Sequence, residues 1–200
     1  QAIRALPAGT TLVVDRLGAH APKRYHAIAQ VYADAERDAH AVPRGADARQ
    51  AIGEALRDSV RHHLVADVPI GVFLSGGIDS GTLVGLMRDV AQSDIQTVTL
   101  SFEAFHGRTE DEAPLAECVA HHYGTRHTTR VVTRAEFDAD LPRILDAMDQ
   151  PSIDGLNVWF AAKAAREVGL KVAVSGVGGD ELFGGYPSFR DVPQWVRLMR

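Results

Sequence analysis

Two stretches of the sequence end an apolar, strand-like run in Ser-Gly and carry an aspartate a few residues further on. The first, VFLSGGIDSG, covers residues 72–81, and the second, VAVSGVGGDELFGGY, covers residues 172–186. A helix that starts directly after the first turn would point free backbone N–H groups at whatever lies in that turn. The first stretch therefore predicts an anion site.

The side chains of the first turn indicate which anion would bind. Gly76 and Gly77 are expected to adopt positive φ and to let the backbone approach a ligand closely. Ser75 and Ser80 add hydroxyl donors. Asp79 would repel a phosphate unless a cation lay between the two. The turn thus predicts a phosphate group together with Mg²⁺.

The sequence of the first turn does not match three well-known phosphate-binding or catalytic loops. A Walker A loop needs a lysine that SGGIDSG lacks, and the glycines at 76, 77 and 81 are misspaced for a dinucleotide fingerprint. A nucleophile elbow needs glycine two residues before the serine, where Phe73 stands. One structural alternative stays open, namely a tight turn in which Asp79 merely caps the following helix.

The second stretch carries an acidic pair inside a glycine-rich loop. Its last twelve residues contain five glycines, with Asp180 and Glu181 between them. Such a loop is costly as plain architecture, since each glycine loses chain entropy on folding and each carboxylate needs a partner. If the two strands lie side by side, Asp79 and Asp180 could face one Mg²⁺ that bridges phosphate oxygens.

The order of elements predicts the fold class. Apolar runs alternate with helical patterns, and the runs lack a polar face, as in a parallel sheet covered on both sides. We therefore expect an α/β, doubly wound parallel sheet with helices on both faces, whose ligands bind where the strand order reverses. The expected strands are 68–74, 95–102, 127–132 and 171–174, and the expected helices are 79–90, 111–123, 134–148 and 156–168.

The beginning of the chain differs from the rest. Prolines and glycines punctuate short strand-like pieces up to about residue 42. A short β-rich segment over 1–42, either an antiparallel appendage or the tail of another domain, is therefore expected before the main domain, 43–200. Asp47 then precedes apolar residues at helical spacing, namely Ile52, Ala55, Leu56, Val60 and Leu64.

Composition excludes several classes of protein. The 46% hydrophobic and 24% charged residues are typical of a globular protein, and the net charge of −5 without a long basic run disfavours nucleic acid as a partner. No apolar run reaches the roughly 18–20 residues of a membrane span, and the first residues lack a signal peptide pattern, so a cytoplasmic location is expected. The single cysteine, Cys118, forms no internal disulfide and is expected in the core.

These residues also carry a family resemblance. LSGGIDS is similar to the pyrophosphate loop of the N-type ATP pyrophosphatases, which have an adenine nucleotide alpha hydrolase-like fold. VSGVGGDELFGGY resembles the synthetase domain of glutamine-hydrolysing asparagine synthetases, β-lactam synthetases and lasso-peptide cyclases. IRALPAGTTLVVD and RYH resemble the end of that family's glutaminase domain, and DEAPLAECVAHHYGTRHTT resembles its second strand-helix unit. The resemblance implies a piece of a longer protein, truncated at its carboxyl end.

The resemblance implies a reaction and a set of residues. The family transfers AMP from ATP to a substrate carboxylate, releases pyrophosphate and lets glutamine-derived ammonia displace AMP, which makes asparagine from aspartate. It implies ATP and Mg²⁺, a glutaminase domain in the same chain, and an assembly state that stays open, a homodimer included. By position, pyrophosphate would be held by Ser75, Gly76, Gly77, Asp79 and Ser80, Mg²⁺ by Asp79 and the catalytic Asp180, and the nucleoside by Leu74, Leu100, Ser175 and Gly176.

One position departs from the family pattern. Asparagine synthetases usually carry an acid between the first two glycines of the second stretch, where this chain has Val177. Valine can neither hold a proton nor bind a cation. Two alternatives to asparagine synthesis therefore remain: a relative acting on another carboxylate in secondary-metabolite or polysaccharide biosynthesis, or a nucleotide-binding regulatory or inactive paralogue.

Two further groups of polar residues lie outside the two stretches. Thr109 and Glu112 fit a capping box at the start of a helix, which explains the acidic run there without a second site. The loop 148–157 would face the substrate in the family, and its candidates are Asp149, Gln150, Ser152 and Asn157, which are also residue types of ordinary turns.

Overall fold

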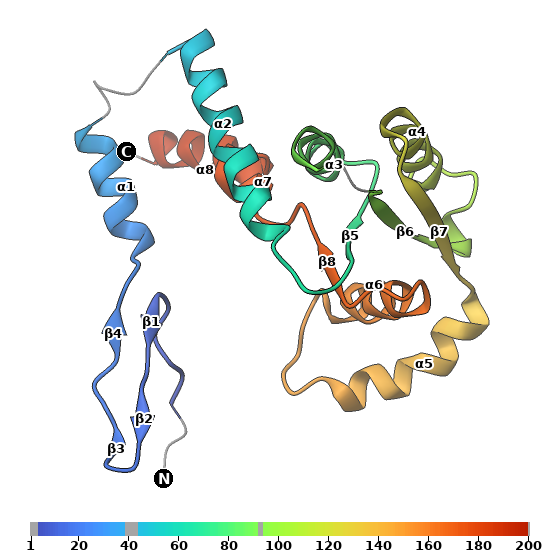
Figure 1. Cartoon of the computed structure of the whole chain (residues 1–200), viewed down its shortest axis with the longest axis horizontal. Helices are drawn as coiled ribbons and strands as arrows, with labels where there is room; N and C mark the ends of the chain where they lie inside the picture. Colours follow the sequence, from blue (N-terminus) through green and yellow to red (C-terminus); the bar gives the residue numbers. More distant parts are fainter. Residues whose placement is uncertain (1–3, 39–43, 92–93, 200) are drawn as a thin grey trace. The chain divides into compact units, whose positions relative to one another are not determined.

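The computed structural model describes residues 4–38, 44–91 and 94–199 (Figure 1). The chain divides into two compact units, residues 1–52 and 53–200, and each is described by itself. The domain boundary predicted between 42 and 43 lies outside the described residues. It stays a prediction, and the compact units part ten residues later.

The first unit contains the expected antiparallel segment. Strand β1 pairs with β4 and β2 pairs with β3, both antiparallel, as predicted for a short β-rich appendage. Helix α1, with no buried residue, was not predicted. The bounds are β1 (Thr10–Thr11), β2 (Val14–Asp15), β3 (Gly18–Ala19), β4 (Lys23–Arg24) and α1 (Ile28–Arg37).

The second unit is built on a four-stranded sheet. Its order is β7-β6-β5-β8 and every neighbouring pair is parallel. Along the chain, β6 and β7 are added on one side of β5, and β8 is then added on its other side. The strand order therefore reverses between β5 and β8. The predicted doubly wound α/β class is confirmed. The bounds are β5 (Ile70–Phe73), β6 (Gln96–Phe102), β7 (Arg126–Val132) and β8 (Val172–Val174).

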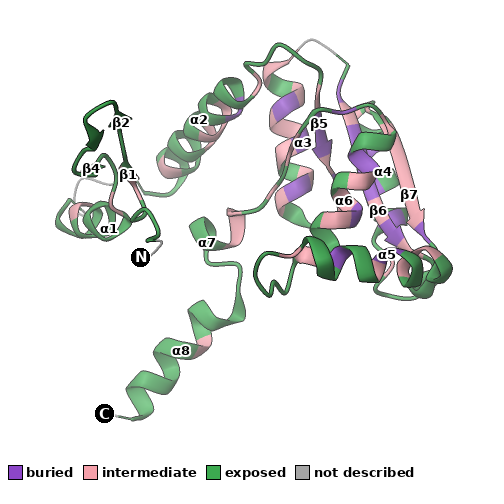
Figure 2. Cartoon of the chain, turned by 90° about the horizontal axis from the view of Figure 1, so that it is seen from below, coloured by how far each residue is buried: buried purple, intermediate pink, exposed green. Residues whose placement is uncertain are grey.

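Helices cover both faces of this sheet (Figure 1). Helices α3 and α4 lie on one face, and α5 and α6 lie on the other. Figure 2 shows the buried residues gathered in the sheet and the helices beside it, whereas α8 is exposed along most of its length. The bounds are α2 (Ala46–His63), α3 (Ile78–Val90), η1 (Glu103–Phe105), α4 (Ala113–Tyr123), α5 (Arg134–Ala147), α6 (Gly155–Glu167), α7 (Gly179–Phe183) and α8 (Pro187–Leu198).

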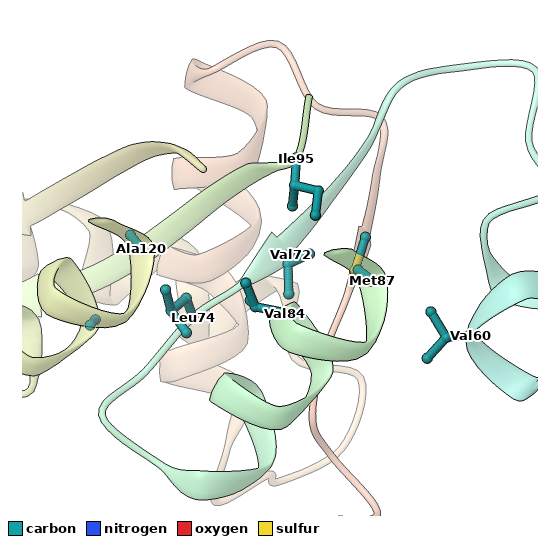
Figure 3. Close-up of a cluster of buried hydrophobic side chains, with 8 residues drawn as sticks. Val60, Val72, Leu74, Val84, Met87, Ile95 and Ala120 are labelled. Atoms are coloured by element: carbon teal, nitrogen blue, oxygen red, sulfur yellow. The ribbon is translucent and has the colours of Figure 1, made fainter. Parts of the chain in front are cut away.

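Two hydrophobic layers hold the sheet between the helices. On the α3 side, Val60 of α2 joins Val72 of β5, Leu74 directly after that strand, and the helix residues Val84 and Met87 (Figure 3). Leu64 packs against the same cluster, so the helical pattern predicted after Asp47 is confirmed at its carboxyl end. On the α6 side, Val132, Ile144 and Phe160 form a buried cluster with aromatic neighbours.

Phe160 is the largest side chain buried below 2% exposure, and it anchors α6. Its ring centroid lies 5.9 Å from those of Phe102 and Phe137. Phe160→Ala should lower the free energy of unfolding by about 3–5 kcal/mol, because it leaves a cavity among rings that cannot collapse fully. Urea titration followed by circular dichroism measures this, with Phe160→Leu as the milder control. A loss below about 1 kcal/mol for the alanine variant would contradict this packing.

A charged network also ties α5, α6 and β7 together. Lys163 Nζ lies 2.6 Å from Glu136 Oε1 and 2.6 Å from Asp140 Oδ2. Arg130 bridges Glu136 and Glu167. These contacts raise the pKa of Lys163 and lower the pKa of Asp140, the hydrogen bond between the two being the largest cause of each shift. The network therefore connects α5 and α6, the helices that precede and follow the loop 148–154.

His127 is enclosed by hydroxyl groups between β6, β7 and α4. Its Nδ1 lies 2.9 Å from Thr97 Oγ1 and its Nε2 lies 3.1 Å from Thr129 Oγ1, while the Thr129 hydroxyl donates to Glu117 at 2.8 Å. Thr129 Oγ1 can then accept from an Nε2–H, and Nδ1 can accept from Thr97. One neutral tautomer satisfies these bonds, and burial lowers the pKa of His127, opposed by Glu117.

Stability should depend on pH through His127. Because the folded chain binds this proton less tightly than the unfolded chain, the contribution of His127 is fully present above about pH 6.5 and declines as the pH falls toward the lowered pKa. Thermal unfolding between about pH 7.5 and 5 should show a smaller acid loss in His127→Gln than in wild type. The exposed His63→Gln serves as the control, and parallel curves for wild type and His127→Gln would sink the prediction.

Cys118 is exposed, so its predicted place in the core is wrong. The buried positions of α4 are Ala113, Ala116 and Ala120, and residue 118 faces the other side of that helix. Across the three described ranges, no helix has the length and apolar character needed to cross a membrane.

Candidate active site at the carboxyl ends of β5 and β8

The two quoted stretches meet at the edge of the sheet where the strand order reverses. Val72 of β5 is in register with Val174 of β8, so the loops that follow both strands leave the sheet at the same edge. Ser75 lies two residues beyond β5 and Ser175 directly follows β8. In open parallel sheets this edge is where ligands bind.

The first loop is held by a pair of serine hydroxyls. Ser80 Oγ lies 2.9 Å from Ser75 Oγ and accepts a hydrogen bond from the Ser75 N–H at 3.1 Å. The same hydroxyl is within bonding distance of the carbonyls of Ser75 (3.2 Å) and Gly77 (3.1 Å). Ser80 is buried, so in this structure its hydroxyl braces the loop from inside. Its predicted contact with pyrophosphate stays a prediction.

The glycines of this loop adopt a different conformation from the one predicted. Gly77 has φ −78° and ψ 152°, and Gly76 is absent from the described glycines with positive φ, so that prediction is wrong. Close packing explains the glycines instead. A Cβ on Gly76 would lie 3.3 Å from the Leu115 side chain, and one on Gly77 would lie 3.1 Å from Ser75 Oγ.

Helix α3 begins in this loop without a side-chain cap. Gly77 is the N-cap residue, and Asp79 lies in the first turn without capping the helix. The alternative in which Asp79 only caps the helix is therefore wrong. The first N–H groups of a helix have no partner within it, so the start of α3 offers donors to an anion, as the sequence predicts.

The second loop packs its glycines directly on Asp79. A Cβ on Gly176 would lie 3.0 Å from the Ser80 nitrogen and 3.1 Å from Asp79 Cβ, and one on Gly179 would overlap Asp79 Oδ2. Because Asp180 follows Gly179, this contact brings the two predicted Mg²⁺ ligands to the same edge. Gly178, with φ 102°, turns the chain here, and Gly184, with φ 69°, ends α7.

The acidic residues of the second loop have separate surroundings. The Asp180 carboxylate lies against Gly185, whose N–H donates to the Asp180 carbonyl at 2.9 Å. Tyr186 donates its hydroxyl to Glu181 Oε1 at 2.9 Å, and this bond is the main cause of the raised pKa of Tyr186. Val177 is 91% exposed, so a carboxylate at this position would stand in solvent at the mouth of the loop.

The carboxylate oxygens at this edge are of the ligand type that Mg²⁺ prefers, but they are too few to hold the ion alone. Within residues 4–38, 44–91 and 94–199, no group of three or more His, Cys, Asp and Glu side chains could hold a metal ion. Mg²⁺ is commonly bound by one or two carboxylates together with substrate phosphates and water. Asp79 and Asp180 therefore fit a cation that arrives with a polyphosphate.

The predicted nucleoside residues have different surroundings, and their contact with a nucleoside stays a prediction. Leu74 is buried under α3, its N–H donates to the Val98 carbonyl at 2.9 Å, and its own carbonyl accepts from Thr99 Oγ1 at 2.6 Å. The structure thus gives Leu74 a core position and no support for a place in a nucleoside pocket. Leu100 is half-buried between two apolar clusters, and Ser175 is exposed beside Gly176.

Glu112 is a residue of this edge that sequence reasoning assigned elsewhere. Its Oε2 accepts a hydrogen bond from the Gly76 N–H at 3.3 Å. The predicted capping box is wrong, because Glu112 is itself the N-cap residue of α4 and forms no side-chain cap. Asp111 accepts from the Ala113 N–H instead, at 3.3 Å. The candidates Asp149, Gln150, Ser152 and Asn157 are exposed, and their contact with a substrate stays a prediction.

The fold and the two loops define a doubly wound parallel α/β domain whose ligand edge lies between β5 and β8. The family model described as Asparagine synthase matches residues 51–200, three quarters of the chain. The chain therefore belongs to the asparagine synthase family.

Similar proteins carry names from the same family. A Mycobacterium bovis protein provisionally named as a glutamine-hydrolysing asparagine synthetase is 42% identical over 142 residues, which cover 70% of this chain and 21% of that protein. Glutamine-hydrolysing asparagine synthetase 1 of Bacillus subtilis is 36% identical, with coverage of 70% and 22%. Asparagine synthetase B of Escherichia coli is 31% identical, with coverage of 72% and 28%. The chain thus spans between about a fifth and just over a quarter of these relatives.

Proposed function

We propose that the protein to which this chain belongs is an ATP-dependent, AMP-forming amide ligase. It adenylates the side-chain carboxylate of aspartate, or of a related acid, releases pyrophosphate and lets glutamine-derived ammonia displace AMP, giving asparagine. The observation that carries the proposal is the packing of Gly176 and Gly179 on Asp79, in a chain of the asparagine synthase family. This packing joins an anion-type loop to a second carboxylate, Asp180.

The proposed mechanism is one of position and charge. The N–H groups at the start of α3 and the Ser75 hydroxyl would receive the oxygens of the leaving pyrophosphate, while Ser80 keeps the loop in shape. Asp79 and Asp180 would hold Mg²⁺, which supplies charge neutralisation when bound. Gly176 and Gly179 let the second loop approach closely enough for both carboxylates to act on one polyphosphate.

Pyrophosphate exchange tests the adenylation step. The full-length protein, incubated with ATP, Mg²⁺ and labelled pyrophosphate, should form labelled ATP only when the correct carboxylate is present. Aspartate is expected to stimulate this exchange. Silence with aspartate and with every other carboxylate tried, in protein that still binds ATP, would rule the proposal out.

Val177 favours a second candidate function. Because its side chain can neither take up a proton nor bind a cation, the role that the family resemblance implies for an acid at this position needs another group, such as Glu181, or a different acceptor. The second candidate is therefore a family member that acts on another carboxylate, or one that binds nucleotide without forming an amide. Exchange stimulated only by a different acid supports the former, and ATP binding without any exchange supports the latter.

The partners and the location belong to the same proposal. Ammonia would come from glutamine through a glutaminase domain in the same protein, and amide formation with glutamine compared with ammonium salts tests this supply. A cytoplasmic location belongs to the proposal because the proposed reaction consumes ATP. A homodimer stays an open alternative, which light scattering of the full-length protein would decide.

A further inference from the structure

The Gly76 N–H already has an anionic partner in this structure. Glu112 Oε2 accepts from it at 3.3 Å, across 36 residues of sequence. Carbons of the same side chain would lie 3.4 and 3.6 Å from a Cβ on Gly76, so the carboxylate stem rests against the loop. A carboxylate of α4 thus stands where the loop offers a backbone donor.

The backbone of Glu112 is fixed, whereas its side chain is free to turn away. Its carbonyl accepts the Ala116 N–H at 3.0 Å in the first turn of α4. The Glu112 side chain is exposed, so a solvated position is available to the carboxylate whenever it leaves Gly76. At 3.3 Å the hydrogen bond is long for an N–H and a charged oxygen, which makes it easy to displace.

We propose that Glu112 is a built-in competitor for the anion site of the loop. The carboxylate occupies the Gly76 N–H while no polyphosphate is bound, and must leave when one enters, because two anions repel each other and cannot share one donor. The inference rests on the proposed function of the loop. Its consequence is weaker binding of pyrophosphate and easier release of that product, since the carboxylate returns to Gly76 as pyrophosphate departs.

A role as a third cation ligand fits the geometry less well. Glu112 accepts a hydrogen bond on the Gly76 side of the loop, whereas Asp79 lies against Gly179 of the second loop. Among the described residues, no trio of metal-binding side chains unites Glu112 with Asp79 and Asp180. Competition for the N–H is therefore the role that the contacts favour.

Titration calorimetry of the full-length protein with pyrophosphate, at fixed Mg²⁺ and low salt, tests the inference. Glu112→Gln removes the charge and keeps the shape, and it should tighten pyrophosphate binding about three- to tenfold. Glu112→Asp keeps the charge on a side chain one methylene shorter. Because its carboxylate should no longer reach the Gly76 N–H, this variant should bind pyrophosphate almost as tightly as Glu112→Gln. Glu110→Gln removes an equal charge from a side chain that accepts from Thr109, and should change the affinity less than about twofold.

The outcomes separate the inference from the proposed function. Weaker pyrophosphate binding in Glu112→Gln would make Glu112 a ligand and overturn the competition. Equal gains in pyrophosphate affinity in Glu112→Gln and Glu110→Gln, with the affinity of Glu112→Asp unchanged, would mean that only the net charge near the loop matters. That result would also overturn the competition. Wild-type protein that binds no pyrophosphate at all would overturn the proposed function together with this inference, whereas normal binding without a Glu112 effect overturns the inference alone.

Discussion

Asp79→Asn should reduce ATP–pyrophosphate exchange by the full-length protein on the order of 10²–10³-fold, the loss typical when one electrostatic stabiliser of a reaction is removed. Asp79 lies in the first turn of α3, between the donors of the loop and the glycines of the second stretch. An amide of the same shape keeps this packing and loses the charge that would hold Mg²⁺ against the phosphates. Exchange rates at several Mg²⁺ concentrations measure the effect.

The control for this substitution lies on the same helix. Asp89 pairs with Arg57 at 3.0 Å at the other end of α3, where both side chains are partly exposed. Asp89→Asn makes the same chemical change and should leave exchange within about twofold of wild type, because exposed ion pairs contribute little. Full exchange by Asp79→Asn, or an equal loss in both variants, would remove Asp79 from the cation site.

The parallel sheet and the helices that cover it could be predicted because their causes are local. Apolar β-branched runs without a polar face specify buried strands, and the helical spacing between them specifies crossovers, so β6, β7, α3 and α6 lie within one or two residues of their predicted bounds. The meeting of the two loops was predicted only on the condition that their strands lie side by side, and the parallel pairing of β5 with β8 meets that condition.

The contacts inside the site could not be predicted in the same way. Glu112 reaches Gly76 only because α4 packs beside α3, and no spacing rule connects residues 36 positions apart. Ser75 and Ser80 were predicted to hold pyrophosphate, which stays a prediction, but the sequence did not reveal that their hydroxyls lie 2.9 Å apart within the loop. Gly76 and Gly77 suggested positive φ, whereas the structure gives them no positive φ and close neighbours that leave little room for a Cβ. The contacts of Glu112 and Gly76 come from tertiary packing, which local patterns do not encode.

Gly179→Ala should abolish most of the exchange activity while the domain stays folded. The added methyl group would overlap the Asp79 carboxylate, so either the second loop or Asp79 must move. A displacement of about 1 Å at a catalytic group can cost on the order of 10²-fold in rate. Exchange kinetics and ATP binding report this loss, and circular dichroism reports the fold, which should persist because α7 contributes no buried residue.

Gly81→Ala is the matched control, because it adds the same methyl group to the first stretch without a clash. The nearest atom to its Cβ would be Val119 Cγ1 at 3.8 Å, an ordinary contact, and alanine within a helix is more stable than glycine by roughly 0.5–1 kcal/mol. This variant should keep its activity and unfold at a slightly higher temperature. If Gly179→Ala were as active as Gly81→Ala, the second loop could not lie against Asp79 during the reaction. The proposed Mg²⁺ site shared by Asp79 and Asp180 would then be refuted, even though both carboxylates are intact in this variant.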